Sequence, residues 1–350
     1  MRINNVLYFL LLLLSNNCKD RYQFSIIRTK NRLVVNGGIS DMEGPSYLKL
    51  GTTSQIEKDS DPLPGAHVEI IDENGTREAY VDMGDGKYRL DGNVVKGFRN
   101  GTYILEIKLP DGQRYRSSPE KMPSPRGTDS AYFKVTKDKV ITSEGYLVDN
   151  TNIAVLLNTR LPKTEAPAYF RWGIDEVYCI IPTCRPGSIV CPPFCYIYQA
   201  VSKFNLRTIP SSASHELVFK GILLQTRAVD FTFLVRHYFN ITQYSMNPNA
   251  YDYWKKVELL TERNGSIFDT PPTNIPGNIY NVMDQSEQVF GYFEASAGVR
   301  TRVFVDRGYI PIDITSCDWS YLIPGGNLYS YCLNCNAIKG STNIPPVWFF

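Results

Sequence analysis

Apolar and polar residues alternate in short runs through the first third of the chain, and residues typical of tight turns separate these runs. Residues 66–71 alternate in this way, and Asn74-Gly75, a pair typical of hairpin turns, closes the run. Asp-Gly pairs supply further turns at similar spacing, and no helical period occurs before residue 140. Short, evenly spaced strands with tight turns between them predict an N-terminal β-sandwich.

The rest of the chain carries longer apolar runs and one helical pattern. Residues 217–224 and 230–236 predict two long strands, the second with His237 at its end. Asn247 and Pro248 are typical of a helix cap and first turn, and apolar residues follow at a spacing of three to four. We therefore expect a mainly β protein: an N-terminal Ig-like or carboxypeptidase-regulatory-like β-sandwich, followed by a second β-rich domain with one short helix.

A chain of 350 residues is long enough for two domains, each with a core of its own. Three prolines fall within residues 119–126 and predict a hinge between the domains. The expected segments are a signal peptide over residues 1–17, a tether over 18–29, the N-terminal β-sandwich over 30–126 and the C-terminal β-rich domain over 127–350.

The leader has the pattern of an exported lipoprotein. A run of nine apolar residues over 6–14 spans only about 13 Å as a helix, which suits a signal peptide and not a membrane span. Cys18 follows a short polar step that resembles the bacterial lipobox, although Asn17 stands where Gly, Ala or Ser is usual. We expect acyl chains on Cys18 to hold the mature chain on a membrane. Ordinary secretion with an unrelated Cys18, and a retained signal anchor, are the alternatives.

Seven further cysteines, in a chain expected to be exported, favour disulfides. The candidate disulfide cysteines are Cys179, Cys184, Cys191, Cys195, Cys332 and Cys335. Because seven is odd, at least one thiol stays unpaired within the chain, and the pairing stays open. A zinc site and a redox-active pair are the alternatives. Only one Cys-x-x-Cys pair is present, however, and no βαβ pattern surrounds it.

Charge and motifs argue against several classes of protein. The 37 Lys and Arg residues and 35 Asp and Glu residues give a net charge of +2, which does not favour nucleic acid as a partner. Neighbouring residues of a strand point to opposite faces, so Ser214-His215-Glu216 does not form a catalytic triad. Residues 82–86 have incomplete calcium-ligand spacing and favour a hairpin turn. We expect no catalytic residues, no metal and no cofactor.

Aromatic residues make up 13% of the chain, and 23 of them are tyrosines. Tyr and Trp combine apolar area with a polar tip and are enriched where a protein grips a partner or ligand. The candidate binding aromatics are Trp172, Trp254 and Tyr292, for which packing in a core is the alternative. This composition favours a binding protein over an enzyme.

Several phrases, taken in order, resemble one family of proteins. They are residues 33–37, 65–70, 86–88, 101–107, 111–117, 169–172, 250–254, 267–272, 275–281, 289–296, 332–335 and 346–348. The most specific are Phe-Asp-x-Pro-Pro over 268–272 and Gly-Tyr-Phe-x-Ala-Ser over 291–296. With these phrases the chain is similar to Bacteroidota outer-membrane lipoproteins that share a domain of unknown function (DUF4249-like). The resemblance implies a lipid-anchored, β-rich protein, often encoded beside a TonB-dependent receptor, and implies no catalytic residues.

Anchor and resemblance together predict an outer-membrane protein that is lipid-anchored through Cys18 and accessory to a TonB-dependent transporter. It would help to capture or deliver a nutrient. A structural or adhesive surface lipoprotein without a transport role is the alternative. The nutrient, the side of the membrane and the oligomeric state stay open.

Overall fold

The computed structural model describes residues 31–53, 60–124, 126–164, 167–181, 194–200, 207–211, 215–262, 275–314, 335–338 and 340–349. Residues 32–350 form one compact unit by their contacts. The expected signal peptide over 1–17, the tether over 18–29 with Cys18, and the cysteines Cys184, Cys191, Cys317 and Cys332 lie outside the described residues. Within the described part of the chain, no helix combines the length and apolar character that crossing a membrane requires.

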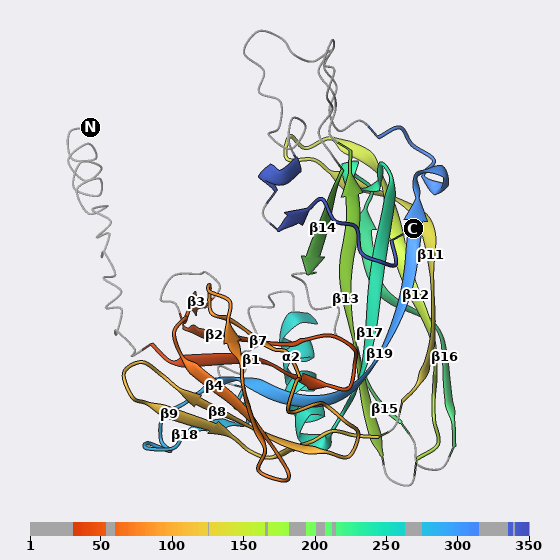
Figure 1. Ribbon diagram of the computed structural model, residues 1–350. Coiled ribbons are helices and arrows are strands. Elements are labelled where there is room, and N and C mark those ends of the chain that lie inside the picture. Colours follow the sequence, from red (N-terminus) through yellow and green to blue (C-terminus); the bar gives the residue numbers. More distant parts are fainter. Residues whose placement is uncertain are drawn as a thin grey trace, which may run out of the picture. The chain divides into compact units, whose positions relative to one another are not determined.

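The fold is mainly β, as predicted, and α2 (Pro248–Glu262) is the only α-helix among the described residues (Figure 1). The largest sheet has 11 strands. Its strands from the first part of the chain are β1 (Leu33–Ser40), β2 (Ser46–Thr52), β3 (Asp61–Pro62), β6 (Val81–Asp82) and β7 (Lys87–Leu90). Its later strands are β13 (Ala168–Ile180), β14 (Cys195–Ala200), β15 (Arg207–Ser211), β17 (Arg236–Met246), β19 (Phe290–Asp306) and β20 (Ser341–Thr342).

Two smaller sheets and three short 3₁₀ helices complete the described elements. The six-stranded sheet contains β4 (His67–Asp72), β5 (Arg77–Ala79), β8 (Thr102–Lys108), β9 (Arg114–Ser117), β10 (Glu120–Lys121) and β18 (Ile279–Asn281). The three-stranded sheet contains β11 (Thr128–Ile141), β12 (Leu147–Leu161) and β16 (Leu217–Ala228). The 3₁₀ helices are η1 (Phe231–Phe233), η2 (Arg307–Tyr309) and η4 (Cys335–Ala337).

Alternation along the strands builds an N-terminal β-sandwich. Tyr103, Leu105 and Ile107 of β8 are buried, while the residues between them are half-buried. They pack with buried side chains of β1, β2 and β7, such as Leu48 and Tyr88, in one core. Because side chains of a strand alternate between its faces, this pattern leaves the other face of the six-stranded sheet polar. The predicted hairpin turn after β4 is confirmed, since the Gly75 N–H donates to the Asp72 carbonyl at 3.1 Å.

A second core lies among later strands. Phe170 and Trp172 of β13, Phe239 of β17 and Val155 of β12 are fully or almost fully buried there. This core joins the three-stranded sheet to the later strands of the largest sheet.

Strand β19 connects the two cores. Its first residues pair in parallel with β1, from Val34 opposite Phe290 to Ser40 opposite Ser296. Its remaining residues, 297–306, pair antiparallel with β17. Strand β18 also returns to the N-terminal sandwich, where it pairs with β9. Strands β18 and β19, which come late in the chain, therefore pair with strands of the N-terminal sandwich.

Within the expected hinge over 119–126, residues 120–122 belong to the sandwich. Glu120 and Met122 are fully buried, and β10 pairs with β8. A segment held by buried side chains and strand hydrogen bonds is part of the sandwich and not a linker.

The predicted helix is confirmed, and one predicted strand is corrected. The Ala250 N–H donates to the Asn247 side chain at 2.8 Å, the bond expected of a cap residue. Over 230–236, however, the chain first forms η1, and β17 begins only at Arg236. The Asp230 carboxylate accepts from the N–H and the hydroxyl of Thr232, at 3.0 and 2.6 Å, and so stabilises a turn where the apolar run predicts a strand.

Candidate functional site

A hollow lies beside helix α2, and we call it the α2 hollow. It has a volume of about 480 Å³. One wall is the polar face of the helix, where Asn249, Asp252, Tyr253 and Lys256 recur at helical spacing. The opposite wall is residues 276–280 with Ser118, and Tyr292 of β19 closes the base.

A buried carboxylate stabilises the base of this hollow. Glu120 is fully buried and accepts hydrogen bonds from the Tyr292 hydroxyl at 2.8 Å and the Asn278 amide at 3.0 Å. The side-chain amide of Asn247, the cap of α2, donates to the same carboxylate. Burial raises the pKa of Glu120 to about 7, although the three hydrogen bonds oppose the shift. One side chain therefore ties the helix cap, the opposite wall and the base together.

Beneath the helix, a second buried carboxylate joins three elements. Arg171 of β13 donates from Nε and Nη2 to both carboxylate oxygens of Glu294, at 3.2 and 3.1 Å. The Arg171 guanidinium lies over the rings of Tyr244 and Trp254, at 4.0 and 4.7 Å from their centroids. The Trp254 indole N–H also donates to Glu294. Charge pairing and cation–π contact hold α2 against the sheet.

The three candidate binding aromatics have different positions. Tyr292 lines the α2 hollow, and the centroid of its ring lies 4.9 Å from that of the Tyr253 ring. Trp254 is 7% exposed on the buried side of the same helix. Trp172 is 1% exposed in the second core, where its indole N–H donates to Asp129 at 2.7 Å. Trp254 and Trp172 therefore pack as core residues, and only Tyr292 belongs to the site.

Sequence reasoning missed the charged residues that organise this site. Glu120 lay in the expected hinge, and Glu294 lay within a phrase that carried only the family resemblance. Their burial depends on contacts of Glu120 with the helix cap Asn247 and of Glu294 with Trp254 of the helix, and these contacts leave no local periodicity in the sequence. The spacing of the polar residues at 249, 252 and 256 on the predicted helix was the one available signal.

A third cluster of polar side chains is buried beside the second core. The Glu176 carboxylate lies 3.2 Å from His237 Nε2 and accepts from Gln225 at 2.6 Å and from Arg227 at 3.2 Å. Burial alone would raise the pKa of Glu176, but His237, Arg227 and Gln225 outweigh it and lower that pKa. The His237 ring stacks on Phe233, with ring centroids 4.2 Å apart. Because its charged groups pair with one another and its histidine ring packs on Phe233, the cluster has a structural role.

Two further motifs have structural roles. Asp82 accepts from the N–H groups of Gly65 at 2.7 Å and Gly84 at 2.8 Å, and a turn joins β6 to β7 as predicted. Glu216 pairs with Arg160 at 3.4 Å on the surface, and Ser214 lies outside the described residues.

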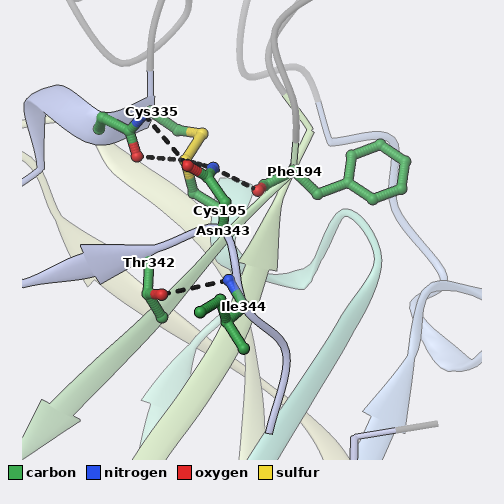
Figure 2. Close-up of a disulfide and its surroundings, with 7 residues drawn as sticks. Phe194, Cys195, Cys335, Thr342, Asn343 and Ile344 are labelled. Carbon is green, nitrogen blue, oxygen red and sulfur yellow. Dashed lines mark hydrogen bonds between the residues drawn. A yellow bond between two sulfur atoms is a disulfide. The ribbon is translucent and has the colours of Figure 1, made fainter.

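The described cysteines include one disulfide. Cys195 of β14 is bonded to Cys335 of η4, with Cα atoms 5.8 Å apart. Figure 2 shows Asn343 beside this bond, where its amide donates to the Phe194 carbonyl at 2.8 Å. Cys179 was a candidate for a disulfide, but it is a free, buried thiol. Burial raises its pKa to about 11, which keeps it protonated and unreactive at neutral pH.

The family model of a domain of unknown function, DUF4249, matches residues 19–302 of the chain. The match includes α2, β10 and all but the last residues of β19, and with them every residue of the α2 hollow named above. No curated protein matches the sequence at a significant level.

Proposed function

The chain belongs to the DUF4249 family, whose domain has no known function, and from this membership we propose that it is a lipid-anchored envelope protein that works by binding. In this proposal Cys18 is acylated and anchors the chain at the outer membrane. The folded part serves a TonB-dependent transporter as an accessory binding component that holds or delivers a nutrient. The leader pattern and the family resemblance support the anchor and the partner.

The α2 hollow is the observation that carries the binding role. Its volume of about 480 Å³ falls within the range of roughly 300–1,000 Å³ that is usual for ligand sites. Asn249, Asp252 and Lys256 offer exposed donors and acceptors along one wall, beside the ring of Tyr253. The buried Glu120 holds the base in place before any ligand arrives. A concave, preorganised site with a few polar groups suits capture of a small ligand.

Co-purification tests the proposal. The tagged full-length chain is recovered from detergent-solubilised outer membranes, and we expect a TonB-dependent receptor to accompany it. The matched control is Cys18→Ala, which we expect to lose the fatty acid at its mature N-terminus and to leave the membrane fraction. Recovery of the wild-type chain without a receptor would count against the transporter role, and a mature N-terminus without acyl groups would remove the anchor.

A structural or adhesive role is the second candidate, and the tip of the β11–β12 hairpin favours it. Ile141, Tyr146 and Leu147 are 73%, 70% and 62% exposed at this tip. Exposed apolar groups that cluster in this way mark sites of protein or membrane contact. Deletion of the gene separates the two roles: growth loss on one nutrient supports transport, whereas altered adhesion or envelope integrity supports the structural role.

A further inference from the structure

Tyr280 of β18 is a lining residue both of the α2 hollow and of a second hollow. The second hollow, which we call the sheet groove, has a volume of about 300 Å³ on the outer face of the six-stranded sheet. Tyr280 is 39% exposed, so its ring is available to a molecule that passes from one hollow to the other. The two sites therefore adjoin at a single aromatic side chain.

Strand register arranges the sheet groove as two rows of polar side chains. Tyr280 is opposite Arg116, Arg116 is opposite Glu106, and Glu106 is opposite Glu69. In the second row, Arg114 is opposite Lys108, and Lys108 is opposite His67. The residues between the rows, Tyr115, Ile107 and Val68, are buried in the sandwich core, so both rows face outward.

Cations exceed carboxylates on this face. Arg77 donates to Glu69 at 3.0 Å and to Glu106 at 2.8 Å, and so engages both carboxylates of the groove. Lys108, Arg114 and Arg116 remain as a cationic group, and among the described residues only Arg116 of these three lies near a carboxylate, at 3.6 Å from Glu106. Arginine binds carboxylate and other acid groups through two parallel hydrogen bonds. The groove is therefore built to receive negative charge.

The α2 hollow offers different chemistry. The amide of Asn249, the carboxylate of Asp252, the ammonium group of Lys256 and the hydroxyl of Ser118 line it as exposed or half-exposed groups. Asn278 and Tyr292 are already engaged by Glu120. Mixed donors and acceptors at short spacing match a ligand with many hydroxyl groups, since each hydroxyl both donates and accepts.

We propose that the α2 hollow, Tyr280 and the sheet groove form one track for an acidic oligosaccharide. A sugar ring lies with its C–H face on the Tyr280 ring, its hydroxyl groups bind in the α2 hollow, and its acid groups bind Arg114 and Arg116. This inference rests on the proposed function, because it names the ligand of the same binding site. A saccharide is favoured over an acidic peptide, because the donors and acceptors of the α2 hollow match hydroxyl groups, which acidic peptide side chains lack.

Calorimetric titration of the purified full-length chain in detergent tests the track. The probes are hexagalacturonate, the neutral hexasaccharide maltohexaose and hexaglutamate. We expect hexagalacturonate to bind more tightly than either of the others, and its affinity to fall as salt is added. Tyr280→Ala and Arg114→Ala should each weaken it at least tenfold.

Matched controls separate the track from general effects of these substitutions. Tyr146→Ala removes a tyrosine at the hairpin tip that is more exposed than Tyr280, and Arg160→Ala removes an exposed arginine, so both should stay within twofold of wild type. Tighter binding of maltohexaose or hexaglutamate, equal losses in the controls, or no binding of hexagalacturonate would each overturn the inference. Receptor co-purification is independent of these titrations, so failure of the ligand class is distinguishable from failure of the transporter role.

Discussion

Arg171 and Glu294 form a two-bond ion pair inside the fold, with side chains that are only 15% and 5% exposed. The pair joins β13 to the part of β19 that pairs with β1, two residues before that pairing ends at Ser296. Because Trp254 donates to the same carboxylate, the pair also fixes helix α2 and one wall of the α2 hollow.

Removing the arginine should destabilise the protein strongly. Arg171→Ala leaves Glu294 as a buried charge without its cation, which costs about 3–5 kcal/mol of unfolding free energy. Arg160→Ala is the matched control, because its pair with Glu216 is exposed and should contribute less than about 1 kcal/mol. Urea unfolding of the two variants measures the difference, and equal losses would contradict this role for Arg171.

Glu120 should make stability fall as the pH rises. Burial raises its pKa from 4.5 to about 7, so the folded state holds the proton more tightly than the unfolded chain. The resulting stability is complete below pH 4.5 and is lost by about pH 7, a change of about 3 kcal/mol. Glu120→Gln should remove this decline, as urea unfolding at a series of pH values will measure. If the unfolding free energy of the variant fell with pH as steeply as that of wild type, Glu120 would not have a raised pKa in the folded state.

Glu176 should have the opposite effect and provides the control for Glu120. Its pKa is lowered in the folded state, so its stabilising contribution is present above pH 4.5 and is lost as the pH falls through the native pKa. Glu176→Gln should lower the unfolding free energy at pH 7 by roughly 1–3 kcal/mol, because His237 and Arg227 lose a buried acceptor. This difference from wild type should narrow in acid, and a difference that widens would contradict the assignment.

Peptide mapping can check the disulfide between Cys195 and Cys335. Digestion without reductant should yield a peptide with Cys195 linked to one with Cys335, and Cys179 should appear as a free thiol. Cys179 should resist alkylation in the native protein and react once the protein is unfolded, since its thiol is buried. The double variant Cys195→Ser/Cys335→Ser opens a connection across 140 positions and should lose about 2–5 kcal/mol. A linked peptide that contains Cys179 would refute this connection.

Gly291 should tolerate no side chain. Its φ is +89°, and a Cβ atom there would lie 1.7 Å from the Val35 carbonyl oxygen, across the pairing of β1 with β19. Gly291→Ala should therefore cost more than about 3 kcal/mol and reduce the folded yield. Gly75→Ala is the control, because its φ is +80° but no atom lies within 4 Å, so only about 1–2 kcal/mol of backbone strain is expected. Equal effects of the two substitutions would show that the close approach is unimportant.

Local signals predicted the local structure. The turn at Gly75, the cap at Asn247 and the alternation along β8 depend on neighbours within a few residues, and all are confirmed. The strand expected over 230–236 was wrong because one side chain, Asp230, stabilises a competing turn.

The sequence pattern did not predict the contacts between residues that are far apart in the chain. The pairing of β1 with β19, the burial of Glu120 and the bond between Cys195 and Cys335 each join residues more than a hundred positions apart. The pattern of apolar residues specifies which face of a strand is buried but not which strand lies beside it. The α2 hollow therefore emerges only when distant segments are brought together.

The route of β19 has a consequence for biogenesis. The first sandwich needs residues 279–281 and 290–296 as strands, so it stays incomplete during synthesis until most of the chain has emerged. Contacts that close such long loops form slowly. The chain would therefore commit to its native topology only after residues 290–296 have been synthesised.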